Sequence, residues 1–432
     1  MTEPFEVRIE KLVYGGEGLG RHEGHTVFAP FVLPGETVTV QPLERRKRFI
    51  RGRVTSVAIP SAERVAAECP HFGTCGGCNY QHIPYEAQLR YKAEILRETL
   101  ARLGKIVWEG AIATHGSPPY GYRNRAQWKI AAAADGQPAV GYFEAGSRRL
   151  CPARACPILS PRLRETLAAF SRLIATRALP AGLREVEAFA DDADEKLLLN
   201  LSFEDLDGPI EAVSDLLRAE LAGAESLLIH IRRADRFELV GPGYLTYGVA
   251  AHRYRVGHLS FFQVNRFLLP ELAEIALGDA RGRLALDLFA GVGLFTVPLA
   301  QRFERVVGVE SNAATARDLE HNLQTSGAAS SSAARNSDVA AFLGRWRETP
   351  DFVLLDPPRA GVPAASLERL AKLGPAAIAY LSCDPATLAR DLTTLVGTKE
   401  KPGRYEIGAV HLVDMFPQSY HLEALLRLTR RA

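Results

Sequence analysis

The sequence predicts an α/β protein in which a small β-barrel comes first, a mixed α+β region follows, and a doubly wound parallel sheet comes last. Three observations lead to this prediction. Residues 1–57 form short runs of alternating apolar and polar residues, and residues 58–255 open with closely spaced cysteines before mixing helical and strand patterns. Residues 256–432 alternate regularly between short buried-strand runs and helical segments. We therefore expect three domains with these bounds.

The composition is that of an ordinary globular protein. Of the 432 residues, 47% are hydrophobic and 24% are charged, which is enough apolar material for several cores. No uncharged apolar run approaches the ~18 residues that a membrane helix needs, and the opening MTEPFEVRIEK lacks the apolar stretch of a secretory signal. We therefore expect a cytoplasmic monomer that has no membrane partner.

The first 57 residues predict a small antiparallel barrel. Runs such as VRIEKLV and ETVTVQPL alternate with period two, and Gly15-Gly16 marks a turn between runs. Short strands at this spacing are typical of a closed barrel. The net charge of the chain is only +2, so a local cluster of cations indicates a local phosphate-binding face, although a charge run is as often a solvated face. Such a cluster falls on the last strands of the barrel: Arg45, Arg46, Lys47, Arg48, Arg51 and Arg53.

The middle region combines a helix, several strands and most of the cysteines. The stretch EAQLRYKAEILRETLARLG has apolar residues at helical spacing, and we expect part of residues 81–112 to pack on the third domain. Cys69, Cys75 and Cys78 crowd together, and Cys151 and Cys156 follow. Sparse, clustered cysteines in a cytoplasmic protein point to a metal site rather than to disulfides. The residues alone favour zinc and an iron–sulfur cluster almost equally, because four thiolates suit both.

The third region predicts a ligand site at one edge of a parallel sheet. RLALDLF, RVVGVE, FVLLD and AIAYLS are short buried-strand runs, and ligands bind at the carboxyl ends of such strands. Gly291 and Gly293 follow the first run, but Thr296 occupies the place of the third glycine of a dinucleotide fingerprint. Glu310 ends the second run and suits ribose hydroxyls, which both NAD and S-adenosylmethionine carry.

Three later motifs place reactive side chains at the same edge. Asp356 opens DPPRAG after the third strand, and Cys383 lies in SCDPATLARDL after the fourth. A lone cysteine is more often an inert core residue, but this one ends a strand beside a polar turn, where nucleophiles sit. Glu423 ends the motif DMFPQSYHLE. His421, in the same motif, has no ligand spacing, and we expect it to be structural.

Together these motifs resemble the RNA uracil-5-methyltransferases that use S-adenosylmethionine, and residues 1–57 resemble a TRAM domain, an OB-like RNA-binding module. The resemblance covers nearly the whole chain. It implies a Rossmann-like S-adenosylmethionine methyltransferase domain, a central iron–sulfur domain, and methyl transfer to carbon 5 of a uridine in RNA. The barrel makes the chain more similar to the ribosomal-RNA branch, so 23S rRNA is the expected target, and the tRNA T-loop uridine is the alternative.

The resemblance also assigns roles to individual residues. Cys383 is the expected nucleophile that adds to carbon 6 of uracil, with its thiolate available near neutral pH, and Glu423 is the expected general base that removes the carbon-5 proton. Asn336 is an alternative to one of the expected contacts with S-adenosylmethionine, Asp338. The full cofactor set is Gln263, Phe289, Glu310, Asp338 and Asp356.

The same resemblance implies a [4Fe–4S] cluster. Its expected ligands are Cys69, Cys75, Cys78 and Cys156, with Cys151 as a rival for the fourth position. Three other functions remain as alternatives: an inactive RNA-binding iron–sulfur protein, an N-methyltransferase and an NAD-dependent dehydrogenase. The first and second are disfavoured by Cys383 and the third by Thr296. We expect the barrel to supply RNA affinity rather than chemistry.

Overall fold

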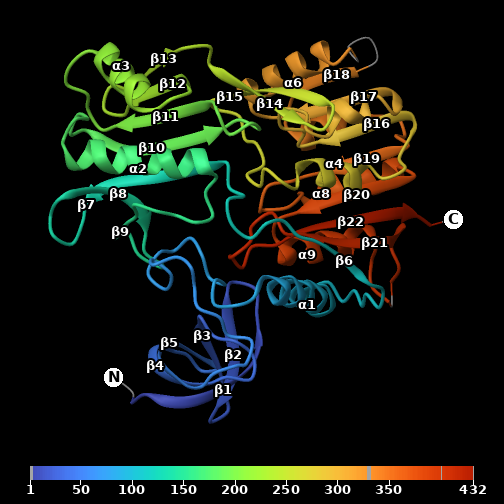
Figure 1. The fold of residues 1–432 in the computed structure, drawn as a ribbon. Helices are drawn as coiled ribbons and strands as arrows, with labels where there is room; N and C mark the ends of the chain where they lie inside the picture. The colour runs from blue at the N-terminus through green and yellow to red at the C-terminus, as the bar shows by residue number, and fades with distance from the viewer. Residues whose placement is uncertain (1–2, 328–331, 400, 432) are drawn as a thin grey trace.

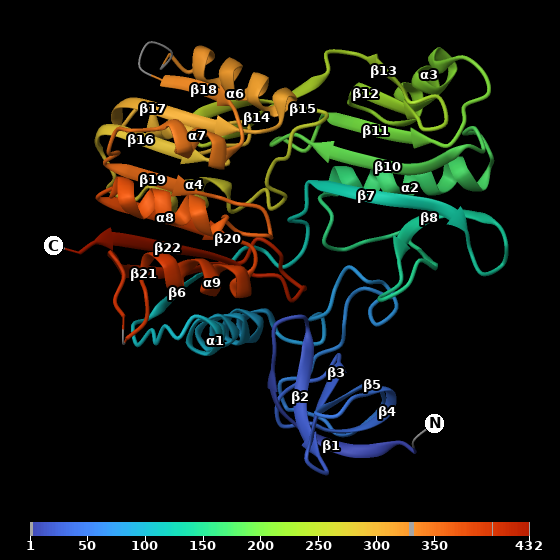
Figure 2. The ribbon, with the colours of Figure 1, turned by 180° about the vertical axis from the view of Figure 1, so that it is seen from behind.

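The computed structural model describes residues 3–327, 332–399 and 401–431. Three bodies follow one another along the chain (Figure 1). A small barrel lies at one end, and a central body and a third body lie side by side beyond it, as the view from behind also shows (Figure 2). Within the described residues, no helix has the length and apolar character needed to cross a membrane.

The barrel is closed and has five strands. Its strands are β1 (Phe5–Leu12), β2 (Glu17–His22), β3 (His25–Pro30), β4 (Thr37–Arg45) and β5 (Phe49–Ile59). They pair in the order β1-β2-β3-β5-β4, and β1 closes the barrel against β4. The expected all-antiparallel pairing is wrong at one place, because β3 and β5 run parallel. Strand β4 pairs antiparallel with both β1 and β5, so β5 returns beside β3 in the same direction.

A seven-stranded mixed sheet forms the central body, and helices α2 and α3 pack with it. The strands lie in the order β13-β12-β11-β10-β7-β8-β9, and only β11 and β12 pair in parallel among the neighbours described. The bounds are β7 (Arg125–Ala132), β8 (Pro138–Phe143), β9 (Leu150–Pro152), α2 (Pro161–Ala175), β10 (Leu183–Ala190), β11 (Leu197–Phe203), α3 (Ile210–Glu220), β12 (Ala224–Ile231) and β13 (Arg236–Val240).

A hairpin joins the central and third bodies. It consists of β14 (Tyr244–Val249) and β15 (His252–Gly257). Tyr254 and Val256 are buried in a core shared with the third body. The expected domain boundary between residues 255 and 256 therefore falls inside β15.

The third body has an eight-stranded sheet in the order β18-β17-β16-β19-β20-β22-β21-β6. Strands β16 to β20 pair in parallel, as the sequence predicts, but β22 is antiparallel to β20. The bounds are α4 (Leu269–Leu277), β16 (Gly282–Leu288), α5 (Thr296–Leu299), β17 (Phe303–Glu310), α6 (Ala313–Thr325), β18 (Ser332–Asn336), α7 (Val339–Arg345), β19 (Phe352–Leu355), α8 (Ala364–Leu373), β20 (Ala377–Ser382), α9 (Pro385–Leu395), β21 (Tyr405–Val413) and β22 (Glu423–Arg430).

Residues between the barrel and the central body contribute to the third body. Helix α1 (Tyr85–Leu103) packs against α9, and β6 (Ile112–His115) pairs in parallel with β21 at the edge of the sheet. The buried face of α1 includes Tyr91, Ile95 and Leu96, which share one core with β16, β19 and β20. The expected packing of residues 81–112 on the third domain is therefore present.

Candidate active site

One cavity gathers every residue that the sequence assigns to catalysis and cofactor binding. It has a volume of about 700 Å³ and lies at the carboxyl ends of the parallel strands of the third body. A cavity of this size is typical of a small-molecule site. The seven expected residues all line it: Gln263, Phe289, Glu310, Asp338, Asp356, Cys383 and Glu423.

Cys383 lies in the short turn between β20 and α9. The next residue, Asp384, caps α9 by accepting hydrogen bonds from the backbone N–H groups of Ala386 and Thr387 at 3.0 and 2.8 Å. This cap restrains the turn on the α9 side of Cys383.

The thiol of Cys383 is protonated at neutral pH in the free protein. Burial raises its pKa to about 11, Glu423 adds to the rise, Arg359 opposes it and Asp356 adds to it. The expectation of an available thiolate near neutral pH is therefore wrong for the free protein. Because a thiol is a poor nucleophile, the proton must leave when the substrate is bound.

Glu423 reaches the same cavity because β22 is antiparallel. Its register pairs Ser382, the last residue of β20, with Ala424, so Glu423 lies one position further along, beside the Cys383 turn. Glu423 is only 3% exposed. Burial raises its pKa well above the usual range, Asp356 raises it further, and Arg359 opposes the rise. A carboxyl group with a raised pKa is a stronger base once it is ionised.

Asp287 and Thr296 form a buried pair close to the cavity residues Phe289 and Phe295 in the sequence. Both are fully buried, and the Thr296 hydroxyl donates a hydrogen bond to Asp287 Oδ2 at 2.5 Å. Burial raises the pKa of Asp287 to about 7. The threonine in place of the third glycine therefore partners a buried carboxyl group.

At its far end the cavity has an open turn beside a carboxylate. The Gly291 N–H donates to Glu310 Oε2 at 3.1 Å, and the Asn312 N–H donates to Glu310 Oε1 at 2.7 Å. A Cβ atom added to Gly291 would meet no atom within 4 Å, so the turn faces open space. Phe289, at the end of β16, has a φ of 66°, a strained value for an aromatic residue, and lines the cavity. This arrangement suits an adenosine group.

Asp338 and Asn336 have different roles in the structure. Asp338 lines the cavity, and its Oδ1 caps α7 by accepting from the backbone of Ala340 and Ala341. The Asn336 side chain donates to the backbone carbonyls of Glu310 and Ser311 and is not among the residues that line the cavity.

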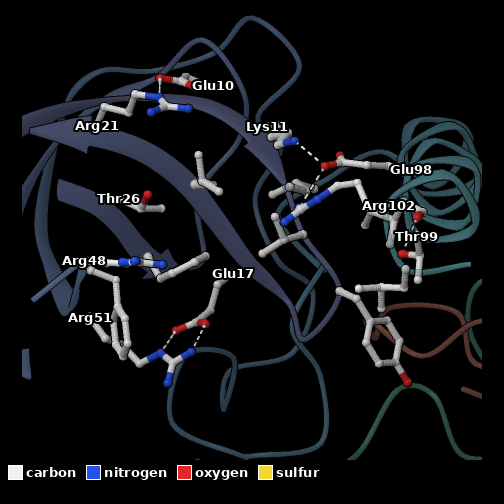
Figure 3. A pocket seen from close by; sticks show the side chains of 18 residues that line it. Glu10, Lys11, Glu17, Arg21, Thr26, Arg48, Arg51, Glu98, Thr99 and Arg102 are labelled. Atoms are coloured by element: carbon white, nitrogen blue, oxygen red, sulfur yellow. Dashed lines mark hydrogen bonds and ion pairs between the residues drawn. The ribbon is translucent and has the colours of Figure 1, made fainter. Parts of the chain in front are cut away.

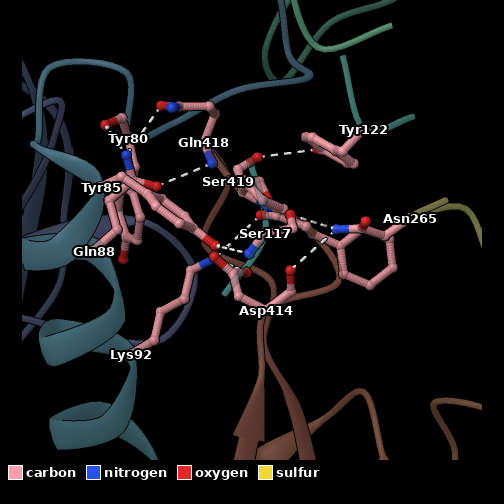
Figure 4. A network of polar contacts seen from close by, with 12 residues as sticks. Tyr80, Tyr85, Gln88, Lys92, Ser117, Tyr122, Asn265, Asp414, Gln418 and Ser419 are labelled. Carbon is pink, nitrogen blue, oxygen red and sulfur yellow. Dashed lines mark hydrogen bonds and ion pairs between the residues drawn. The ribbon is translucent and has the colours of Figure 1, made fainter. Parts of the chain in front are cut away.

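A buried polar network holds the segment before Glu423 (Figure 4). Lys92 of α1, fully buried, donates to Asp414 Oδ1 at 2.7 Å and to the Phe416 carbonyl at 3.1 Å. Gln88 donates to Gln418 Oε1 at 3.0 Å and accepts from the Gln418 N–H at 2.9 Å. Gln418 has a φ of 68°, so these bonds support a strained backbone. Helix α1 therefore holds the segment that contributes Phe416 and Glu423 to the cavity.

Several cavity residues were missed by the sequence analysis. His421, expected to be structural, lines the cavity, and its Nδ1 lies 3.5 Å from Arg359 Nη2. Burial, reinforced by Arg359, lowers the pKa of His421 to about 4, so its ring is neutral at neutral pH. Phe416 and Phe261 also line the cavity. Arg359 lies in the motif DPPRAG and His421 in the motif DMFPQSYHLE, so the sequence could have identified both as residues of the site.

The cysteines of the central region lie near one another but do not form a compact site. Burial raises the pKa of Cys78 to about 12, and the neighbouring Cys156, Cys75 and Cys69 raise it further. Across the described residues, no group of three or more His, Cys, Asp or Glu side chains is gathered closely enough to hold a metal ion. The expected iron–sulfur domain is therefore not shown.

Profiles of known families match both ends of the chain. The TRAM domain matches residues 3–55, and the tRNA (uracil-5-)-methyltransferase family matches residues 346–431. A 23S rRNA (uracil(1939)-C(5))-methyltransferase RlmD from Alkalilimnicola ehrlichii is 34% identical over 100% of this chain and 97% of its own length. The chain belongs to the RNA uracil-5-methyltransferase family. The family named from the motifs is thereby confirmed.

Other relatives agree with this assignment. An RlmD protein from Shewanella baltica is 31% identical to this methyltransferase over 98% of the chain and 95% of its own length. An uncharacterized RNA methyltransferase from Aquifex aeolicus is 32% identical over 99% of this chain and 98% of its own length. The RNA cap guanine-N2 methyltransferase profile matches residues 282–370 only, and this match ends before Cys383 and Glu423.

A solved structure confirms the fold. The Pyrococcus abyssi tRNA (uracil-54, C5)-methyltransferase in complex with S-adenosyl-L-homocysteine has a TM-score of 0.77 and 23% identity. The match covers 98% of this methyltransferase and 100% of that chain, so it includes the barrel. The expected methyltransferase fold with an N-terminal TRAM barrel is therefore confirmed.

Proposed function

We propose that this protein transfers a methyl group from S-adenosylmethionine to carbon 5 of a uridine in 23S rRNA. The convergence of Cys383 and Glu423 in one cavity, beside an edge suited to adenosine, carries the proposal. The names of the RlmD relatives support the ribosomal target. A tRNA uridine is the second candidate, because the Pyrococcus protein, which also includes a barrel in its match, is named for tRNA. The barrel alone therefore does not separate the two targets.

The residues of the chain divide the reaction into two covalent stages. Cys383 first loses its thiol proton to water. Its sulfur then bonds to carbon 6 of the uracil, and the electron pair of the C5–C6 double bond moves toward O4 as an enolate. Carbon 5 then forms a bond to the methyl carbon as the methyl–sulfur bond breaks. Glu423 accepts the carbon-5 proton, the C5–C6 double bond re-forms, and the thiolate of Cys383 leaves.

When bound, S-adenosylmethionine supplies the electrophilic methyl group. The open turn at Gly291 and the Glu310 carboxylate fit the adenosine end, with the carboxylate placed to accept hydrogen bonds from ribose hydroxyls. The residues that would hold it are Gln263, Phe289, Glu310, Asp338 and Asp356.

Mapping 5-methyluridine in a deletion strain tests the target. We expect one ribosomal site to lose its methyl group and to regain it when the intact gene, but not its Cys383→Ala form, is restored. Loss confined to tRNA would support the second candidate. Unchanged 5-methyluridine in both RNAs would overturn the proposed function.

We further propose that Cys69, Cys75, Cys78 and Cys156 bind a [4Fe–4S] cluster in the central body. Each thiolate of such a cluster binds a different iron atom, so the four sulfurs stand farther apart than the ligands of one ion. The Gly77 N–H lies 3.4 Å from Cys75 Sγ, and backbone hydrogen bonds to sulfur accompany such clusters. The three-domain division, the cytoplasmic location and the monomeric state also belong to this proposal.

Protein purified without air is expected to contain iron and acid-labile sulfide in equal amounts and to be brown. Cys78→Ser and Cys156→Ser are each expected to lose both, because a cluster that loses one thiolate is released. Cys151→Ser is the matched control and should keep them. Elemental analysis that finds stoichiometric zinc and no sulfide would contradict the cluster.

We infer that a second cavity, which lies between the barrel and the end of α1, is an RNA-binding groove (Figure 3). It has a volume of about 830 Å³, and Arg51 lies over the rings of Phe28 and Phe49 at 5.6 and 5.9 Å. Guanidinium and aromatic planes are surfaces on which RNA bases stack. The groove carries more positive than negative side chains. Its three acidic residues are Glu10, Glu17 and Glu98, and its five basic residues are Lys11, Arg21, Arg48, Arg51 and Arg102.

Arg48→Ala is expected to weaken RNA binding and to reduce the slope of log K against log salt by about 0.7–1. The slope falls because the variant contacts one phosphate fewer, so binding releases fewer counterions. Methylation at saturating RNA should be unchanged. Arg236→Ala, an exposed arginine on β13 of the central body, is the control and should leave the slope unchanged. An unaltered slope in Arg48→Ala would show that the basic cluster is a solvated face.

A further inference from the structure

The turn between β1 and β2 brings the barrel against the active site. Leu12 and Leu33 of the barrel region are buried in the same core as α1, β16 and β20. In the turn itself, a Cβ atom added to Gly16 would lie 3.1 Å from Tyr420 Cδ1 and 3.2 Å from Asn79 Cβ. The turn is therefore packed closely against the segment that precedes Glu423.

Tyr14, in this turn, contacts both catalytic segments. Its hydroxyl donates a hydrogen bond to the backbone carbonyl of Cys383 at 3.4 Å. Its ring meets Tyr420 edge-on, with centroids 5.7 Å apart and planes at 85°. Tyr420 precedes His421, which lines the cavity, and Glu423 follows two residues later. One side chain of the barrel thus touches the turn of the nucleophile and the segment of the base.

We propose that Tyr14 is a positioning residue, which holds the Cys383 turn and the Tyr420 segment in register so that the barrel completes the catalytic centre. The inference rests on the proposed function, because it assumes that Cys383 is the nucleophile. It replaces the expectation that the barrel supplies affinity alone.

The proposed role follows from what the attack requires. The direction of the Cys383 Cα–Cβ bond is set by the backbone, and Sγ must lie about 3–3.5 Å from carbon 6 to react. When the Cys383 carbonyl loses the hydrogen bond from Tyr14, the turn can rotate. The sulfur then lies within reach of carbon 6 for a smaller fraction of the time. RNA bound elsewhere is unaffected by this rotation. Loss of the Tyr14 hydroxyl alone should therefore slow adduct formation without weakening binding, because the ring that lines the RNA-binding groove is kept.

The test compares three full-length variants with the wild type. Tyr14→Phe removes only the hydroxyl, and Tyr14→Ala removes the ring contact as well. Phe5→Ala is the matched control, because Phe5 stacks on His22 within the barrel. For each, we measure the rate of denaturant-resistant adduct formation with RNA that contains 5-fluorouracil, at saturating RNA, and separately the Kd for unmodified RNA.

Tyr14→Phe is expected to slow adduct formation about threefold to tenfold, the effect of one net hydrogen bond. Tyr14→Ala should slow it by more than tenfold. The Kd of Tyr14→Phe, which keeps the ring that lines the RNA-binding groove, should stay within twofold of the wild type. If Tyr14→Ala fails to fold, as thermal melting would show, Tyr14→Phe carries the test alone.

Adduct rates equal to the wild type in Tyr14→Phe, a change in Kd alone, or an equal slowing in Phe5→Ala would each overturn the inference. A wild type that forms no adduct would refute the proposed function itself. The two failures are therefore distinguishable.

Discussion

Replacing Cys383 with alanine is expected to reduce methylation by about 10³-fold or more and to abolish any covalent link to RNA, because no enolate forms without the sulfur nucleophile. Glu423→Gln is expected to behave differently. It retains the thiol and the methyl-transfer step, but the carbon-5 proton stays in place and the thiol cannot leave. This variant should accumulate a denaturant-resistant protein–RNA adduct, with up to one methyl group per enzyme molecule.

A denaturing gel with radiolabelled methyl groups separates these outcomes. Glu406→Gln, an exposed glutamate on the neighbouring strand β21, is the matched control and should turn over normally. Methylation by Cys383→Ala would show that another nucleophile acts. Free turnover by Glu423→Gln would show that another group removes the proton.

The pH dependence of turnover has a defined sign. Because burial and Asp356 raise the pKa of Glu423, its carboxyl group holds a proton at low pH and gains its base form only as pH rises. The raised pKa of the Cys383 thiol acts in the same direction. Wild-type turnover should therefore increase with pH through the neutral range, whereas resolution of the adduct in Glu423→Gln should not.

Replacing Lys92 with methionine is expected to lower the free energy of unfolding by about 3–5 kcal/mol, because it leaves the Asp414 carboxylate buried without its cation. Both side chains of this pair are fully buried. Since the pair anchors the segment before Glu423, the variant should also lose activity at temperatures where it remains folded. Chemical denaturation measures the first effect, and adduct formation measures the second.

Arg90→Ala is the control on the same helix. Arg90 pairs with Glu63, but their side chains are 50% and 41% exposed, so the loss should be at most about 1 kcal/mol. Adding Asp414→Asn to Lys92→Met should restore part of the stability, because the buried charge is then gone. A loss below about 1 kcal/mol in Lys92→Met would contradict the role of the pair.

Local patterns were sufficient for most of the fold. Period-two runs identified the barrel, helical spacing identified α1, and four buried runs identified β16, β17, β19 and β20. The pairing of distant strands was not readable in this way, because strand direction depends on the path of the chain between strands. The parallel pair β3–β5, the antiparallel β22 and the addition of β6 to the third sheet all depend on such paths.

The residues of the candidate site could be predicted from the sequence alone. Cys383 and Glu423 stand in motifs whose residue types and order carry the chemistry, and every expected cofactor residue lines the cavity. The tertiary structure decided how these groups meet and in which ionisation state they rest. The antiparallel register of β22 brings Glu423 beside the Cys383 turn, and their shared burial raises the pKa of both groups. The contacts of Tyr14 and Lys92 with these segments likewise join residues that lie more than 300 positions apart. Such contacts arise only when the elements pack, because burial and charge proximity are properties of the folded chain and not of any local stretch of it.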